Sequence, residues 1–307
     1  MTNPDPSIKL AALATERRNP ASAKIDLLDT EAVVRVINAE DQLVASAVER
    51  EIPNIAKAVD VITDALIQGG RLIYIGAGTS GRLGVLDASE CPPTFNTDPD
   101  LVIGLIAGGD HALRHPIEQV EDRPEEGANA LMSIGLTEND VVVGIAASGR
   151  TPFVLGAMAW ANEIGSPTIG LCNSPDSALS RVAGISIAPV VGPEVITGST
   201  RMKAGTAQKL VLNMLTTATM VKLGKTYGNL MVDVQSSNAK LRERAVGIVR
   251  DAAEITENTA REVLASAEGD VKTAIVTARL GIPPDEARIR LEQAGGVIRD
   301  ALGENQA

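Results

Sequence analysis

The sequence has few aromatic residues, cysteines and histidines. Of its 307 residues 2% are aromatic, and it contains two cysteines and two histidines. This scarcity of aromatic rings argues against a surface on which nucleic-acid bases stack. Because Cys91 and Cys172 lack the spacing of zinc ligands and only two histidines accompany them, the sequence predicts no metal site. We expect both cysteines to be small buried side chains in a reducing compartment.

Basic charge and long apolar runs are also lacking. The formal net charge is −11, and no cluster of Lys and Arg offsets it, so polyanions and anionic bilayers would be repelled. No stretch reaches the roughly 18 uninterrupted apolar residues of a membrane span, and the start of the chain has no apolar signal core. The sequence therefore predicts a cytoplasmic protein that binds neither nucleic acid nor a membrane.

Small and branched apolar residues are abundant: 44% of residues are hydrophobic and 22% are charged, a balance typical of globular domains. Short runs rich in Val, Ile and Leu, with helical stretches between them, occupy residues 72–78, 101–109, 141–149, 167–173 and 185–192. Because these runs are apolar on both faces, they predict an α/β fold with a parallel, doubly wound sheet covered by helices on both sides. In such a sheet a ligand binds beyond the carboxyl ends of the strands.

Helical patterns flank the predicted sheet. Residues before about 30 are polar and proline-bearing and are interpreted as an unpacked arm. Apolar residues recur at helical spacing over 30–68, with Pro53 opening a second helix. A long apolar helix is predicted over 201–223, and from about residue 236 the pattern is that of a small helical bundle. We expect three parts: an N-terminal arm and helices (1–60), the sheet domain (61–230) and a C-terminal helical domain (231–307).

Three turns share a pattern of hydroxyl residues, Gly and Arg. They are Thr79-Ser80-Gly81-Arg82, Ala147-Ser148-Gly149-Arg150 and Gly198-Ser199-Thr200-Arg201. Ser and Thr at such positions are also ordinary helix N-caps, and for any single turn that is the stronger interpretation. An arginine beside a helix N-terminus opposes the helix dipole, at a cost of up to ~1 kcal/mol. Three such placements, with Lys203 beside the third, therefore predict a bound anion, for which phosphate is the natural candidate.

The first of these turns also matches the spacing of a dinucleotide fingerprint, in Gly76, Gly78 and Gly81. However, Ser80 and Arg82 would crowd a pyrophosphate, and no acidic residue closes a convincing second strand about 20 residues further on. A P-loop lysine is also missing, so nucleotide phosphoryl transfer is disfavoured.

Two acidic segments, 87–93 and 118–122, follow the first two predicted strands. Acidic residues on helix surfaces are usually solvated, which is the stronger interpretation for Glu118 or Asp122 alone. We expect the pair Pro92-Pro93 to stop a short helix and hold Glu90 at the mouth of the crevice. Glu90 and Glu121 end successive β–α units, so they could face one bound sugar and divide acid and base roles between them.

Five longer runs lie at residues 74–95, 104–110, 141–153, 192–214 and 228–234. Together they resemble the N-acetylmuramic acid 6-phosphate etherase family. This family has the sugar isomerase (SIS) fold, a flavodoxin-like sheet. It is related to the glucokinase regulatory protein, which shares a signature of the type GPEVITGSTRMKAG. The resemblance covers roughly residues 20 to 305.

The resemblance implies cleavage of the D-lactyl ether of N-acetylmuramic acid 6-phosphate, giving N-acetylglucosamine 6-phosphate and D-lactate during cell-wall sugar recycling. It implies elimination followed by hydration, without metal or cofactor. The family's proton donor, in the DASECPP motif, maps onto Glu90. Its second essential glutamate maps onto Glu121, where this chain has Gln119-Val120-Glu121-Asp122 in place of a GAED-like motif. Which glutamate removes the first proton stays open.

The SIS fold further implies phosphate contacts from the turns after the strands. These map onto Gly78, Thr79, Ser80, Ser148, Gly149, Thr151, Ser199, Thr200 and Lys203. Family members are homodimers with the site near the subunit interface, which implies that the apolar helix over 201–223 is partly covered by a partner.

Two other functions stay open at this point. A non-catalytic sensor of sugar phosphates, like the glucokinase regulatory protein, would keep the hydroxyl turns and could dispense with the glutamates. A sugar-phosphate isomerase would share the fold and carry its own base. The sequence also leaves open whether His111 or His115 contacts a substrate.

Overall fold

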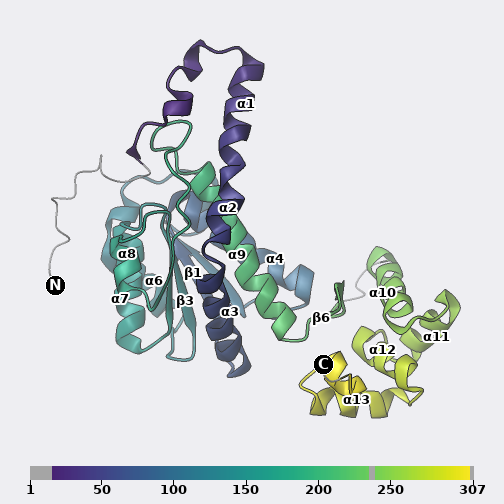
Figure 1. Cartoon of the computed structure of the whole chain (residues 1–307). Helices are drawn as coiled ribbons and strands as arrows, with labels where there is room; N and C mark the ends of the chain where they lie inside the picture. Colours follow the sequence, from purple (N-terminus) through teal and green to yellow (C-terminus); the bar gives the residue numbers. More distant parts are fainter. Residues whose placement is uncertain (1–15, 235–238, 305–307) are drawn as a thin grey trace. The chain divides into compact units, whose positions relative to one another are not determined.

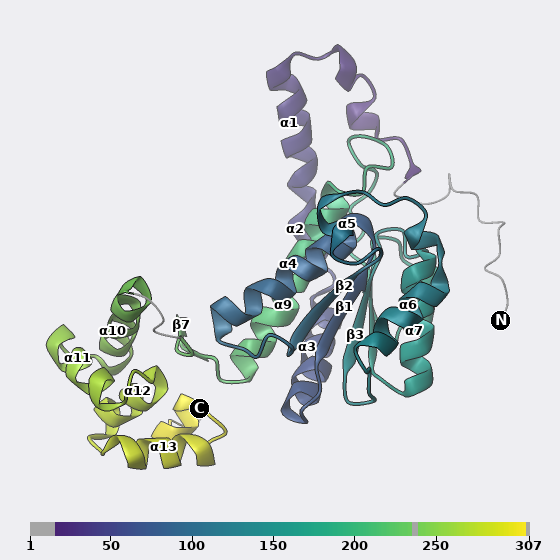
Figure 2. The same ribbon diagram turned by 180° about the vertical axis from the view of Figure 1, so that it is seen from behind.

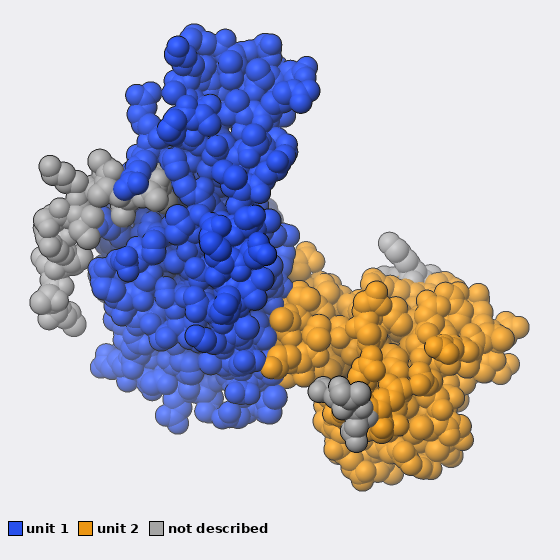
Figure 3. All heavy atoms as spheres, viewed as in Figure 1, with its two compact units in different colours: residues 1–89, 99–216 blue, residues 90–98, 217–307 orange. Residues whose placement is uncertain are grey.

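The computed structural model of the chain describes residues 16–234 and 239–304. The chain divides into two compact units, one made of residues 1–89 with 99–216 and the other of residues 90–98 with 217–307 (Figure 3). Within the described ranges no helix combines the length and the apolar character needed to cross a membrane. The predicted domain boundaries at residues 60 and 230 stay predictions.

The first unit is built on a five-stranded sheet. Its strands are β1 Leu72–Gly76, β2 Val102–Ile106, β3 Val141–Ile145, β4 Thr168–Leu171 and β5 Ile185–Ile187. Their order is β2-β1-β3-β4-β5, and all neighbours are parallel. The predicted parallel α/β sheet is therefore confirmed. Because the chain moves outward in opposite directions from β1 and β3, the turns after these two strands flank the switch point, where doubly wound sheets bind ligands.

Helices cover both faces of this sheet (Figures 1 and 2). One face is covered by α6 Pro124–Ser133, α7 Pro152–Ile164 and α8 Ala178–Val182, and the other by α3 Ile52–Ile67, α4 Gly78–Phe95 and α9 Lys203–Lys222. On the first face, Ile73 and Val142 are buried against Met158 of α7. The apolar character of the strands on both sides follows from this double cover.

The N-terminal region is more ordered than the sequence predicts. It contains η3 Pro20–Ser22, η4 Ile25–Leu27, α1 Thr30–Asp41 and α2 Leu43–Glu49. Asn19 and Ser22 are buried, so the predicted unpacked arm is wrong for this segment. Pro53 lies in the first turn of α3, as predicted. None of the residues of α1 is buried, and this helix projects away from the sheet (Figure 1).

The predicted stop at Pro92-Pro93 is wrong, because α4 continues through both prolines to Phe95. Proline removes a hydrogen bond of the helix ladder, but here only the final turns are affected. The helix ends where the N–H of Asn96 donates to the carbonyl of Pro92 at 2.9 Å and Asn96 adopts a left-handed conformation with φ 51°. Glu90 therefore lies within the helix, with an exposed side chain.

The second unit contains the predicted helical bundle. Its helices are α10 Ala239–Ala253, α11 Glu257–Ser266, α12 Val271–Leu280, α13 Pro284–Gln293 and α14 Ile298–Leu302. Left-handed residues lie between these helices: Gly281 ends α12 with φ 66°, and Glu254, between α10 and α11, has φ 57°. A short hairpin that the sequence analysis did not predict, β6 Thr226–Tyr227 with β7 Leu230–Met231, packs against this core through Tyr227 and Leu230.

Candidate functional site

Two pockets lie at the carboxyl edge of the sheet. The first, of about 320 Å³, is lined by Ala77, Gly78, Arg82, Ala107, Ala112 and residues 116–121. The second, of about 280 Å³, is lined by Glu16, Glu121, Asp122, Ser148, Arg150, Thr151 and Pro152. Glu121 lines both pockets, so the structure brings this predicted catalytic residue together with the turns after β1 and β3.

The turn after β3 is held by its own backbone. Gly149 has φ 64°, its N–H donates to the carbonyl of Ala146 at 2.8 Å, and its carbonyl accepts from the N–H of Leu179 at 2.9 Å. A Cβ atom at Gly149 would lie 2.2 Å from Oγ of Ser177, so only glycine fits. Thr151 stands at the N-cap of α7 without making a capping hydrogen bond. Its hydroxyl and the positive end of α7 can therefore interact with an anion.

The turn after β1 is tied to helix α9. Ser80 is buried, and its hydroxyl donates to Oε1 of Gln208 at 2.8 Å. Gln208 in turn donates to Oδ1 of Asn173 at 3.3 Å. Gly78 and Thr79, which precede Ser80, are exposed and half-buried respectively. Because the proton of Ser80 is used inside the fold, only its oxygen lone pairs remain for a ligand.

The arginines of the first two turns differ in their contacts. Arg82 donates to the carbonyls of Leu113 at 3.0 Å and Ala112 at 2.6 Å, so it holds the connection that follows β2. Arg150 is half-buried and has no hydrogen-bond or ion-pair partner in the described part of the chain. Arg150 is thus the cation that the second pocket offers to an anionic ligand.

The third turn is organised differently from the prediction. Glu194 is 1% exposed, and its carboxylate accepts from the N–H groups of Lys203 at 3.0 Å and Ala204 at 2.9 Å. A carboxylate of the chain itself therefore binds the N-terminus of α9, where the sequence predicted an external anion. Burial raises the pKa of the Glu194 carboxyl, against the effect of these N–H groups.

Lys203 is also withdrawn from solvent. Its side chain is 1% exposed, and its Nζ lies 2.5 Å from Oε2 of Glu40. The phosphate contact of Lys203 stays a prediction, and its ammonium is already paired with Glu40 inside the fold. Ser199 and Thr200 are half-buried. The neighbouring Gly198 lies beside Glu16, whose Oε2 would be 3.2 Å from a Cβ at Gly198.

Comparisons with known proteins bear on this site. Models of the SIS domain and of the glucokinase regulatory protein N-terminal SIS domain match residues 118–218 and 54–162, and the C-terminal lid domain of that regulatory protein matches residues 228–272. An N-acetylmuramic acid 6-phosphate etherase of Brucella anthropi is 57% identical over 299 residues, 97% of each chain. The chain belongs to the N-acetylmuramic acid 6-phosphate etherase family. Another member, from Rhizobium rhizogenes, is 56% identical, with the same coverage of each chain.

Solved structures similar to this etherase-family chain include phosphoheptose isomerases from Francisella tularensis and Neisseria gonorrhoeae. Their TM-scores are 0.44 and 0.46 at 16% identity, with coverage of 62% of this chain and 100% and 97% of theirs. The family resemblance and the SIS fold read from the sequence are both confirmed by the family comparisons.

The two predicted catalytic glutamates of this etherase-family chain differ in setting. Glu121 lies in η5 Val120–Asp122, which follows Gln119 in a left-handed conformation with φ 64°. Its carboxylate is exposed and makes no hydrogen bond or ion pair with the described residues. Glu90 belongs to the second compact unit. That both carboxylates serve one substrate stays a prediction.

Sequence reasoning missed Asp87, one helical turn before Glu90. Its side chain is 6% exposed, and it accepts hydrogen bonds from the hydroxyl of Tyr74 at 3.0 Å and the amide of Asn213 at 2.6 Å. Burial raises the pKa of this carboxyl. The signal in the sequence is weak, because the other acidic residue of the same motif, Glu90, is exposed and the pattern does not tell the two apart. Glu16 was also missed, since it lies in the segment interpreted as an arm.

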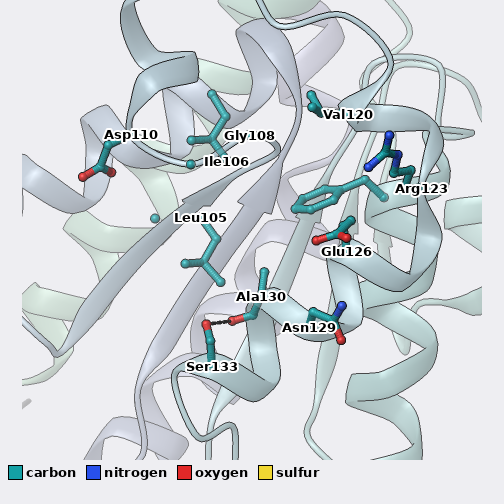
Figure 4. A pocket seen from close by; sticks show the side chains of 13 residues that line it. Leu105, Ile106, Gly108, Asp110, Val120, Arg123, Glu126, Asn129, Ala130 and Ser133 are labelled. Carbon is teal, nitrogen blue, oxygen red and sulfur yellow. Dashed lines mark hydrogen bonds between the residues drawn. The ribbon is translucent and has the colours of Figure 1, made fainter.

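A third and larger cavity, of about 550 Å³, lies next to η5 (Figure 4). Leu105 of β2, Val120 of η5 and Glu126 and Asn129 of α6 are among the residues that line it. None of the predicted site residues lines this cavity. His111 and His115, whose ring centroids are 4.8 Å apart, line none of the three cavities.

Proposed function

We propose that this chain cleaves the lactyl ether of N-acetylmuramic acid 6-phosphate and releases D-lactate and N-acetylglucosamine 6-phosphate, in the recycling of cell-wall amino sugars. The observation that carries the proposal is the 57% identity to an N-acetylmuramic acid 6-phosphate etherase over 97% of both chains. The position of Glu121 between two hydroxyl-bearing turns supports it.

The phosphate group binds at the turn after β3 in this proposal. Ser148 and Thr151 offer hydroxyls, Gly149 lets the backbone approach closely, and the N-terminus of α7 and Arg150 offset the negative charge. Further contacts come from the turn after β1, at Gly78, Thr79 and Ser80, and from Ser199 and Thr200. Lys203 is left out of this set because its ammonium is bound to Glu40.

The carboxylates exchange protons with the open-chain sugar. Its aldehyde acidifies the hydrogen on the adjacent carbon, and one carboxylate takes that proton as the neighbouring C–O bond breaks. The leaving lactate oxygen receives a proton. A water molecule then adds across the new double bond, so that one hydroxyl and one hydrogen return to the sugar. We assign these proton transfers to Glu90 and Glu121, without deciding which acts first.

We also propose a homodimer in the cytoplasm. Helix α1 and the segment before it carry large apolar side chains in solvent, with Leu27 75% exposed and Val34 58% exposed. Exposed apolar groups concentrated on a projecting helix favour a protein partner. The predicted partner contact of the long apolar helix is supported by Val221, which is 50% exposed. Cys91 and Cys172 are both buried, as is usual for cysteines in a reducing compartment.

Incubation of the protein with N-acetylmuramic acid 6-phosphate, followed by measurement of D-lactate, tests the proposal. We expect lactate release by the unmodified chain and a rate about 100- to 10,000-fold lower for Glu90→Gln. A folded sample that releases no lactate would contradict the etherase function and favour a regulator or an isomerase. Undiminished release by Glu90→Gln would keep the function and remove Glu90 from the catalytic pair.

A further inference from the structure

The loop over residues 192–201 lies between β5 and α9, and directly after it the first residue of α9 forms a buried ion pair with helix α1. Nζ of Lys203 lies 2.5 Å from Oε2 of Glu40, and the two side chains are 1% and 14% exposed. The same carboxylate oxygen accepts from the amide of Asn19 at 2.7 Å. Burial would raise the pKa of Glu40, but the hydrogen bonds from Lys203 and Asn19 hold it below its usual value.

The segment before α1 also donates hydrogen bonds to the loop. The amide of Asn19 also donates to the carbonyl of Pro193 at 3.0 Å, and the hydroxyl of Ser22 donates to the carbonyl of Val195 at 2.7 Å. Between these two carbonyls stands Glu194, which binds the first N–H groups of α9. The loop over residues 192–201 is therefore held from one side by the N-terminal segment and from the other by its own helix.

This loop forms neither helix nor strand, and its internal backbone hydrogen bonds, from the N–H of Ser199 to the carbonyl of Ile196 and from the N–H of Thr200 to that of Gly198, both 3.0 Å, lie in its distal part. It contains two glycines in left-handed conformations, Gly192 with φ 73° and Gly198 with φ 76°. Its distal part carries Ser199 and Thr200, the hydroxyls proposed to contact the phosphate. A loop that presents binding groups is useful only when a rigid scaffold fixes it.

We infer that Lys203, Glu40 and Asn19 are positioning residues, which fix the loop over 192–201 for binding of the sugar phosphate without touching it. The inference rests on the proposed function, specifically on the phosphate contacts of Ser199 and Thr200. It gives Lys203 an indirect role in place of the direct contact that its position in the signature suggests.

The test compares two buried ion pairs in the first unit. Lys203→Met breaks the pair beside the loop, and Arg71→Met breaks the pair of Arg71 with Asp140, whose Nη2–Oδ2 distance is 2.8 Å and whose side chains are 25% and 2% exposed. Arg71 and Asp140 directly precede β1 and β3, so this control lies at the amino edge of the sheet. Removing one partner of a buried pair destabilises a protein in either place.

We expect both variants to lower the thermal midpoint but only Lys203→Met to weaken binding. In that variant KM for N-acetylmuramic acid 6-phosphate rises about tenfold or more with kcat changed by less than about threefold, whereas in Arg71→Met KM stays within about twofold. An unchanged KM in folded Lys203→Met, or an equal rise in Arg71→Met, overturns the inference. If Lys203→Met does not fold, Asn19→Ala replaces it, with an expected rise of about threefold in KM.

Two further variants complete the experiment. Glu40→Met breaks the same ion pair but keeps the ammonium of Lys203, so a positioning role predicts a rise in KM like that of Lys203→Met. A normal KM in folded Glu40→Met beside a raised KM in Lys203→Met would mean a direct contact of Lys203 with the phosphate, against the inference. Ser199→Ala with Thr200→Ala tests the underlying proposal: an unchanged KM there removes the phosphate contacts and the inference with them. If Ser199→Ala with Thr200→Ala raises KM while Lys203→Met leaves KM normal, the inference is overturned and the proposed phosphate contacts stand.

Discussion

Gly149 is the position at which a single added methyl group tests the site most sharply. A Cβ there would lie 2.2 Å from Oγ and 2.5 Å from Cβ of Ser177. Carbon atoms pack at about 3.5–4.0 Å, so the turn or Ser177 must move by about 1 Å in Gly149→Ala. The left-handed conformation of Gly149, φ 64°, adds about 1–2 kcal/mol of strain for an alanine.

The displaced turn carries Ser148 and Thr151, and a misplacement of about 1 Å can cost about 100-fold in rate. We therefore expect Gly149→Ala to lower kcat/KM for lactate release about 100-fold, while the thermal midpoint falls by only a few degrees. Lactate release and circular dichroism on the same preparation measure the two effects separately.

The control keeps the added methyl group at position 149 and removes the side chain of Ser177, with which it collides. Ser177→Gly deletes both clashing atoms of Ser177, and at this N-cap of α8 glycine costs only a few tenths of a kcal/mol. The double variant Gly149→Ala with Ser177→Gly should therefore recover kcat/KM to within about tenfold of the unmodified value. A folded Gly149→Ala with full activity, or a double variant no better than the single one, would refute this reasoning.

Two further predictions concern charge. Arg150 lacks a partner among the described residues of the second pocket. Arg150→Met should therefore weaken binding of N-acetylglucosamine 6-phosphate about tenfold and leave binding of unphosphorylated N-acetylglucosamine unchanged, as measured by calorimetry. Equal losses of affinity for both sugars would speak against a phosphate contact. Burial raises the pKa of Asp87 above its unfolded value, so the folded state keeps this proton to higher pH and stability from this group falls as pH rises through that pKa. We expect the free energy of unfolding of the unmodified chain to fall relative to that of Asp87→Asn as the pH rises above about 4. Urea unfolding of both proteins at several pH values measures this. A difference between the two that does not change with pH would contradict the assignment.

Local sequence patterns predicted the sheet and its turns. Strands β1, beginning at Leu72, and β3, beginning at Val141, are buried throughout. Their uninterrupted apolar sequences indicated this burial on both faces. The strands end a few residues before the predicted ends because the Gly-rich segments that follow already form the turns. Glu121 was placed at the carboxyl edge by the same reasoning, since the end of a β–α unit in a parallel sheet falls there.

What the sequence could not show were contacts between distant segments. Lys203 and Glu40 are 163 residues apart, and Asn19 and Pro193 are 174 apart. From the sequence Lys203 was a free cation beside a hydroxyl turn, and only the fold supplies its partner. The capping by Glu194 was hidden for a related reason, because its loop reverses before α9 and brings the carboxylate to the start of the helix.

Helix α4 shows the limit of a local rule. A proline pair normally stops a helix, but here the prolines fall in the last turns, and the left-handed Asn96 ends the helix. The prediction was wrong by a few residues along the chain, and this changed the setting of Glu90 from a helix end to an exposed helical face.

The rate of D-lactate release by Glu121→Gln, at saturating N-acetylmuramic acid 6-phosphate, tests most directly the claim that the carboxylate shared by the two pockets moves a proton of the substrate. The account predicts a kcat about 100- to 10,000-fold below that of the unmodified chain, with unchanged affinity for N-acetylglucosamine 6-phosphate. A kcat within about threefold of the unmodified value, in a folded variant that binds the sugar phosphate normally, would contradict it.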